Sequence, residues 1–150
     1  MELKLEVVGV PVSDVDRAIK FYKEAMGFRL DADFNAEAWE QLFGFKAPGG
    51  PDFRAVQLTP PGSACSIHLK KNAGTASLEG LYLVTSDIEA TRAELVSRGV
   101  DVSEPFYFGP EGKTAGVHPE RQSYNSYISL RDPDGNTWLI QEIKQRLPGR

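Results

Sequence analysis

The distribution of apolar residues predicts that the chain begins with a strand and continues with a helix. Residues 3–12 are rich in Val and Leu and end at Ser13, as a strand would. Apolar residues then recur at helical spacing as far as Met26, and Gly27 is a suitable helix end. Ser13, followed three residues later by Asp16, predicts a hydroxyl cap at the start of this helix. Three further strands are expected at residues 28–34, 53–58 and 64–69.

The second half of the chain predicts the same order of elements again. Residues 81–85 have the composition of a strand, and Ser86 to Glu89 form a capping box in front of a helix that closes at Gly99. Three strands should follow at residues 102–108, 123–130 and 137–143. A turn at residues 132–136 would join the last two strands.

This order reflects an internal repeat with a spacing of 73 residues. Ser13 and Asp14 return as Ser86 and Asp87, and Pro61-Gly62 returns as Asp134-Gly135. A unit repeated in this way predicts two similar modules within a single domain, enclosing a cleft between them. We place the first module at about residues 1–71, a small polar linker at about 72–78, and the second module at about 79–145.

Composition narrows the classes of function. The chain has 150 residues, a net charge of -4 and no basic block, which argues against a nucleic-acid partner. Its apolar runs are too short to cross a bilayer, so no membrane partner is expected. The first residues lack a signal-peptide pattern and Cys65 is the sole cysteine, which makes a cytoplasmic location the expectation. Cys65 itself is expected to be a small buried strand residue rather than a nucleophile, because no histidine or base motif adjoins it.

Two segments interrupt the repeat and contain aromatic residues. Residues 35–52 include Trp39 and Phe43, four apart, as on one face of a short helix. Residues 109–122 lead into Tyr124. Long insertions between strands often determine binding specificity, but their aromatic residues can equally fill gaps in the core. The sequence leaves both interpretations open.

Several motifs together resemble the opening and closing of a known module. The run Pro11-Val12-Ser13-Asp14, then Phe21-Tyr22 in the helix, Met26-Gly27-Phe28 after it, and the late Asp132–Asn136 turn are similar to the vicinal oxygen chelate superfamily. That superfamily includes glyoxalase I, bleomycin-resistance proteins and extradiol dioxygenases. The resemblance implies an α+β fold in which two tandem βαβββ modules form a curved mixed sheet around a cleft, with the helices outside. It also implies a homodimer. It is specific for fold and poorly specific for function.

The resemblance implies four places for a divalent metal, two in each module. In this sequence they fall on Val7, Ser66, Gly80 and Leu139. Val, Gly and Leu side chains offer no metal donor, so no cofactor is expected at the usual positions.

Strand alternation indicates which other side chains would line the cleft. If Ser66 and Leu139 face it, His68 and Gln141 do so as well, and Tyr82 follows from Gly80. A floor that is mostly apolar with a few polar groups suits a small organic ligand. Further candidate ligand contacts from the two insertions are Trp39, Phe43, Arg121 and Tyr124.

Three functions are compatible with these residues. The first is a metal-free binding protein for a small apolar or aromatic molecule. The second is a metal-dependent lyase or dioxygenase with relocated ligands, including His68. The third is a metal-free lyase or isomerase in which His68 is the base and Tyr82 or Gln141 polarises a carbonyl. His68 could also be a neutral residue of the pocket wall. We rank binding first.

Overall fold

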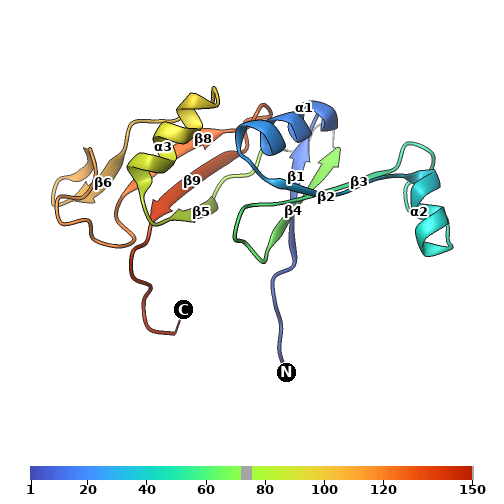
Figure 1. Ribbon diagram of the computed structural model, residues 1–150, viewed down its shortest axis with the longest axis horizontal. Coiled ribbons are helices and arrows are strands. Elements are labelled where there is room, and N and C mark those ends of the chain that lie inside the picture. The colour runs from blue at the N-terminus through green and yellow to red at the C-terminus, as the bar shows by residue number, and fades with distance from the viewer. Residues whose placement is uncertain (72–75, 150) are drawn as a thin grey trace. The chain divides into compact units, whose positions relative to one another are not determined.

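The computed structural model describes residues 1–71 and 76–149 and has an α+β fold with two mixed sheets (Figure 1). The chain divides into two compact units, Met1–Ala76 and Ser77–Arg150. The core of the expected linker, residues 72–75, lies outside the described residues.

The first unit contains a four-stranded sheet covered on one face by helix. Its strands are β1 (Val7–Val12), β2 (Arg29–Asn35), β3 (Arg54–Thr59) and β4 (Ser66–Lys71), in the spatial order β1-β4-β3-β2. Strand β1 is parallel to β4, and the other pairs are antiparallel. Helix α1 (Val15–Lys20) continues directly into a π-helical turn, η1 (Phe21–Ala25). The buried core between helix and sheet consists largely of Val10, Val12, Ala18, Tyr22, Val56, Leu58, Ile67 and Leu69.

The second unit repeats this arrangement with one additional strand. Its strands are β5 (Leu81–Thr85), β6 (Phe106–Gly109), β7 (Gly112–Ala115), β8 (Tyr127–Arg131) and β9 (Thr137–Glu142), in the order β5-β9-β8-β6-β7. Helix α3 (Ile88–Ser97) packs against β8 and β9 (Figure 1). Trp138 is buried beneath the helix layer with Ile128, Leu130 and Ile140.

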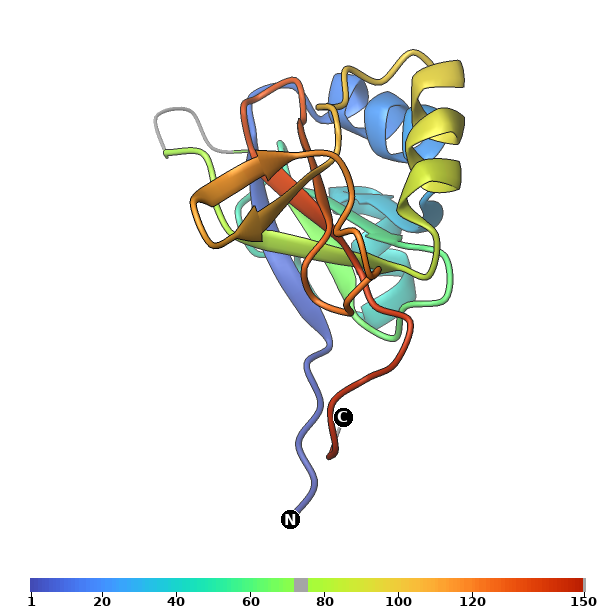
Figure 2. The same cartoon turned by 90° about the vertical axis from the view of Figure 1, so that its left-hand side faces the viewer.

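Strand β7 was not expected from the sequence. It forms a hairpin with β6 inside the segment that we interpreted as a loop (Figure 2). Gly109 pairs with Gly112, and Gly112 has a φ of 94°, a backbone conformation that glycine adopts at little cost. The short polar strand Gly112–Ala115 carries no apolar alternation, so periodicity gave no signal for it.

Helices α1 and α3 each begin with an aspartate cap rather than a serine hydroxyl cap. Asp14 accepts a hydrogen bond from the backbone N–H of Arg17 at 3.0 Å, and Asp87 accepts one from Ala90 at 3.0 Å. The predicted serine caps are therefore wrong by one residue. The carboxylates take the role because Asp14 and Asp87 have the extended backbone that an N-cap requires.

The aromatic insertion of the first unit contains a helix, as the spacing of Trp39 and Phe43 indicated. Helix α2 (Ala36–Phe43) begins at Asn35, whose side chain accepts from the N–H of Ala38 at 2.9 Å. It ends at Gly44 in the left-handed conformation. In Figure 1, α2 lies beyond the ends of β2 and β3.

The two sheets differ in the register of their parallel strands. In the first sheet Gly9 lies opposite His68, whereas in the second Tyr82 lies opposite Leu139. Tyr82 follows Gly9 by the repeat spacing of 73, but Leu139 follows His68 by 71. The spacing of 73 thus holds for the opening strands and not for the closing ones. By strand pairing, the counterpart of Leu139 is His68 rather than Ser66, and His68 and Gln141 are not counterparts.

Candidate functional site

The face of the first sheet opposite α1 carries His68 near its centre. His68 lies on β4 between Gly9 of β1 and Gln57 of β3. Its neighbours along the strand, Ile67 and Leu69, point to the helix side and are buried, so alternation places the half-buried imidazole on the open face. His68 therefore lies on the face of the first sheet that the helix does not cover.

The surroundings of His68 favour the neutral form of its imidazole. Its burial lowers the pKa below the ordinary value of 6.5, and the charge of nearby Lys70 lowers it further. No residue in the described parts of the chain forms a hydrogen bond with this ring.

A polar chain runs beside His68 through Asp31, Thr59 and Ser66. Asp31 lies at a bulge between Leu30 and Ala32 and accepts a hydrogen bond from Thr59. The hydrogen bond from Thr59, and then that from Arg29, lowers the pKa of Asp31, so its carboxylate is charged. Since Thr59 donates its only hydroxyl hydrogen to Asp31, Ser66 must be the donor in the 2.7 Å contact between the two hydroxyls. The oxygen of Ser66 keeps only acceptor capacity.

On the corresponding face of the second sheet, β9 lies between β5 and β8. On this face Leu139 lies between Tyr82 and Ser129, and Gln141 lies between Val84 and Tyr127. Tyr82 is 57% exposed and Val84 is 47% exposed, unusually high for large apolar strand residues. A hollow of about 350 Å³ on the same unit is lined by Asp101, Ser103, Ser129, Leu130, Arg131 and Thr137.

An aromatic cluster extends this face toward the β6–β7 hairpin. The ring of Tyr127 stacks on Phe106 with centroids 5.5 Å apart, and Phe108 meets Tyr127 edge-on at 5.8 Å. The ammonium of Lys113 lies 4.1 Å from the centre of the Phe106 ring, a cation–π contact. These rings were not among the ligand contacts expected from the sequence. The alternation of Phe106 and Phe108 within one strand was the signal available for them.

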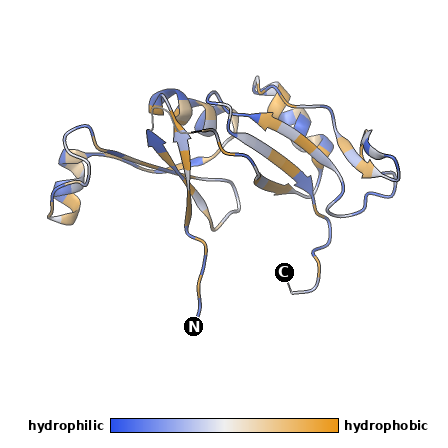
Figure 3. Ribbon diagram, turned by 180° about the vertical axis from the view of Figure 1, so that it is seen from behind, coloured by the Kyte–Doolittle hydropathy of each residue, from blue (hydrophilic) through white to orange (hydrophobic). Residues whose placement is uncertain are grey.

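Trp39 and Phe43 belong to a separate aromatic cluster on α2. Their ring centroids are 4.4 Å apart, and Trp39 also contacts Phe45 and Phe53. Phe43 and Phe45 are more than half exposed, and hydrophobic segments are visible on α2 in Figure 3. The contacts of these rings lie within residues 39–53, away from the sheet positions of His68.

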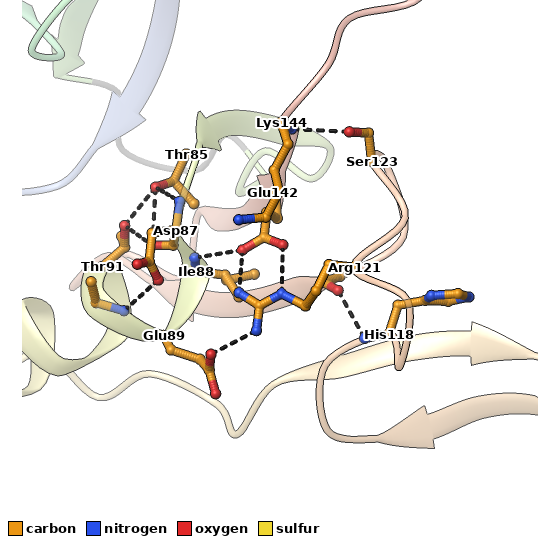
Figure 4. Close-up of polar contacts among 12 residues, drawn as sticks. Thr85, Asp87, Ile88, Glu89, Thr91, His118, Arg121, Ser123, Glu142 and Lys144 are labelled. Atoms are coloured by element: carbon orange, nitrogen blue, oxygen red, sulfur yellow. Dashed lines mark hydrogen bonds and ion pairs between the residues drawn. The ribbon is translucent and has the colours of Figure 1, made fainter.

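Arg121 is engaged in ion pairs rather than presented to a ligand (Figure 4). Its Nε and Nη2 donate to the two carboxylate oxygens of Glu142 at 3.0 and 2.8 Å, and its Nη1 donates to Glu89 at 2.6 Å. Glu142 is fully buried and also accepts from the backbone N–H of Ile88 at 2.9 Å. Burial alone would raise the pKa of Glu142, but the bonds from Arg121 and Ile88 outweigh it and lower this pKa.

Tyr124 contributes to the site through its backbone. Its hydroxyl accepts from the N–H of Leu147 at 2.9 Å, away from the sheet. Its carbonyl oxygen accepts hydrogen bonds from the hydroxyl of Tyr127 and from the side-chain amide of Gln141 at 2.9 Å. Tyr124 was expected as a candidate ligand contact, but the atom that takes part here is its backbone carbonyl oxygen.

The four positions at which the vicinal oxygen chelate superfamily usually binds a metal hold at most one donor side chain in this chain. They fall on Val7, Ser66, Gly80 and Leu139, of which only Ser66 has a polar side chain. Val7 pairs with Ser66, whereas Leu139 pairs with Tyr82 and not with Gly80. Within residues 1–71 and 76–149, no three His, Cys, Asp or Glu side chains lie together as a metal site would require.

Comparison with known proteins agrees with the fold and the motifs. The model of the Glyoxalase/Bleomycin resistance protein/Dioxygenase superfamily matches residues 4–140. The chain belongs to this superfamily. The uncharacterized protein YetH of Bacillus subtilis (strain 168) is 22% identical over 143 residues, which cover 93% of this chain and 98% of YetH.

Two solved structures from Streptomyces sp. CB03234 are similar at higher identity. One is TnmS3, an antibiotic binding protein, with 30% identity, a TM-score of 0.66, and coverage of 95% of this chain and 97% of TnmS3. The other is a glyoxalase/bleomycin resistance protein, with 31% identity, a TM-score of 0.62, and coverage of 93% and 100%. Among the described helices of our chain, none is long and apolar enough to span a membrane.

Proposed function

We propose that this chain binds a small apolar or aromatic molecule on the open face of its second sheet, without the metal centre usual in the family. The observation that carries the proposal is the combination of exposed Tyr82 and Val84 with the aromatic cluster of Phe106, Phe108 and Tyr127 on one face. Exposing such side chains to water is unfavourable, and an aromatic ligand would cover them.

Two further findings support binding of a small molecule. The hollow beside Ser129 has the size of a small-ligand site, at about 350 Å³. TnmS3, 30% identical over nearly the whole chain, is an antibiotic binding protein. We infer that the ligand of this chain is of the same broad kind, an organic molecule rather than an ion.

The proposal is tested by titrating isotopically labelled protein with naphthalene derivatives and following backbone amide signals by NMR. We expect shifts concentrated in β5, β6, β8 and β9. Replacing Phe106 by Ala should weaken binding about tenfold, because the face loses a stacking partner. Phe45→Ala, in the α2 cluster, is the matched control and should bind as the original protein does. The proposal fails if no aromatic compound binds while a divalent metal binds tightly at one ion per chain.

Metal-free catalysis with His68 as general base is the second candidate. It is supported by the position of His68 on the open face of the first sheet, where burial lowers the pKa of its imidazole. An enzyme of this kind would show a pH–rate profile that His68→Ala abolishes. The metalloenzyme alternative is separated from both by metal analysis of the purified protein, and it is rejected if His68→Ala keeps full metal content.

A further inference from the structure

The side chain of Gln141 is held in a single orientation by three hydrogen bonds around Tyr124 and Tyr127. Its amide nitrogen donates to the carbonyl oxygen of Tyr124 at 2.9 Å and to the hydroxyl of Tyr127 at 3.0 Å. The hydroxyl of Tyr127 donates its own hydrogen to the same Tyr124 carbonyl. A carbonyl can only accept, so the nitrogen of Gln141 must face Tyr124, and both of its hydrogens are used. The atom of Gln141 that is left for a ligand is Oε1, an acceptor.

The carbonyl that fixes Gln141 is itself held in place by the backbone. Tyr124 has a φ of 71°, a left-handed conformation that is unfavourable for a residue with a side chain. It is stabilised by a hydrogen bond from the Tyr124 N–H to the carbonyl of Glu142, at 2.9 Å. The preceding Arg121, with a φ of 52°, is bound to the buried carboxylate of Glu142. Two unfavourable backbone conformations are thus maintained where they aim one carbonyl at Gln141.

The oriented acceptor lies among apolar and aromatic surfaces. Val84 and Tyr127 flank Gln141 on the neighbouring strands, and the ring of Tyr127 stacks on Phe106. Leu139 lies two residues along the same strand and on the same face. A ligand covering this surface would place its ring on apolar atoms and its edge against Oε1 of Gln141. A ligand acceptor at that edge would meet a second acceptor and be disfavoured.

We propose that Gln141 determines specificity by selecting aromatic ligands that donate a hydrogen bond, such as phenols and aromatic amines, over those that offer only acceptors. This inference rests on the proposed function and specifies the chemistry of the molecule bound. Tyr127 acts as a positioning residue, because its hydroxyl oxygen accepts a hydrogen bond from one of the two amide hydrogens of Gln141.

The inference is tested with a matched pair of probes, 2-naphthol and 2-methoxynaphthalene, which differ in whether the oxygen carries a hydrogen. Dissociation constants are measured by NMR titration for the original protein, for Gln141→Met and for Tyr127→Phe. A single neutral hydrogen bond predicts that the original protein prefers 2-naphthol by about 3- to 10-fold. Gln141→Met should bind both probes alike. Phe45→Ala lies in the separate aromatic cluster of α2 and should retain the preference.

Tyr127→Phe distinguishes the loss of one hydrogen bond to Gln141 from a general loss of structure, because the two change the affinities for the probes differently. It leaves the stacked ring in place and releases one amide hydrogen of Gln141, so the preference for 2-naphthol should shrink while affinity for 2-methoxynaphthalene is kept or improved. Equal binding of the two probes by the original protein overturns the inference and leaves the proposed function intact. A preference that persists in Gln141→Met also overturns it. Failure of both probes to bind overturns the inference and the proposed function together.

Discussion

The carboxylate of Glu142 is fully buried and lies 2.8 Å from Nη2 of Arg121, a residue 21 positions earlier in the chain. Glu142 belongs to the last strand, and Arg121 to the segment that follows the β6–β7 hairpin. The same carboxylate accepts from the first N–H of α3. One side chain therefore fixes a loop, a strand and a helix start to one another.

Replacing Glu142 by Gln should lower the free energy of unfolding by about 2–3 kcal/mol, because the Arg121 guanidinium then lacks the charge that compensates its partial burial. Urea denaturation measures the change. Glu89→Gln is the control, since Glu89 is 62% exposed and its pair with Arg121 should be worth about 0.5 kcal/mol. Equal effects of the two substitutions would contradict the role assigned to Glu142.

Glu142 also predicts a direction for the acid dependence of stability. Its pKa is lowered in the folded chain, so the stabilisation is present above the ordinary value of 4.5 and is lost as pH falls through the folded value. Denaturation of the original protein should therefore become easier on acidification below about pH 4.5. In Glu142→Gln this part of the pH dependence of stability should be absent. An unchanged profile of stability against pH would contradict the assignment of this dependence to Glu142.

His68 should titrate below its ordinary value in the folded protein. Because the neutral form is favoured on folding, its contribution to stability is full above pH 6.5 and declines as pH falls from there toward the folded pKa. Lys70→Met removes a positive charge beside the ring and should raise the pKa of His68, as followed by its NMR signals. Lys71→Met, one position further along β4, should change it less.

The helix caps offer a direct comparison of aspartate with serine. Asp14→Ala and Asp87→Ala should each destabilise the protein by about 1 kcal/mol, because each leaves a helix N–H without its acceptor. Ser86→Ala, next to the second cap, should cost less than about 0.5 kcal/mol. Thermal denaturation of the three variants decides between the carboxylate caps and the hydroxyl caps that the sequence suggested.

Thr59→Val tests the direction of hydrogen-bond donation from Ser66 through Thr59 to Asp31. Without the hydroxyl of Thr59, the carboxylate of Asp31 loses the strongest of the interactions that lower its pKa, so the pKa of Asp31 should rise. Ser66→Ala removes the far end of the chain but keeps the bond between Thr59 and Asp31. That variant should leave the pKa of Asp31 nearly unchanged, as measured by carboxyl NMR.

Much of the fold could be predicted because it depends on local signals. Strand alternation, the glycines after each helix and the repeat of Ser13-Asp14 gave the order of the βαβββ modules and the face on which His68 lies. The strand Gly112–Ala115 was missed because its pairing depends on a turn between two glycines and not on apolar periodicity. The separation of the strands into two sheets depends on long-range pairing, which a single sequence does not encode locally.

The candidate site was harder to predict than the fold. The interpretation of Gln141 and Tyr82 as residues of one face agrees with the strand pairing, since alternation determines it. The engagement of Arg121 by Glu142 and the use of the Tyr124 carbonyl depend on left-handed backbone at two non-glycine residues. Such backbone conformations leave little signature in the sequence. The sequence therefore pointed to Tyr124 as a side chain, although the atom that contacts Gln141 is its backbone carbonyl oxygen.

The register difference between the parallel strands has a consequence for engineering. A designer who installs metal donors by copying one half of the chain onto the other at a constant spacing of 73 would pair Ser66 with Leu139. Strand pairing instead matches His68 with Leu139, two residues further along β4, or about 7 Å. Coordination bonds tolerate errors far smaller than that. A graft built on the repeat alone would therefore displace one donor by two positions along its own strand, whereas one built on strand pairing would use His68, a histidine already present.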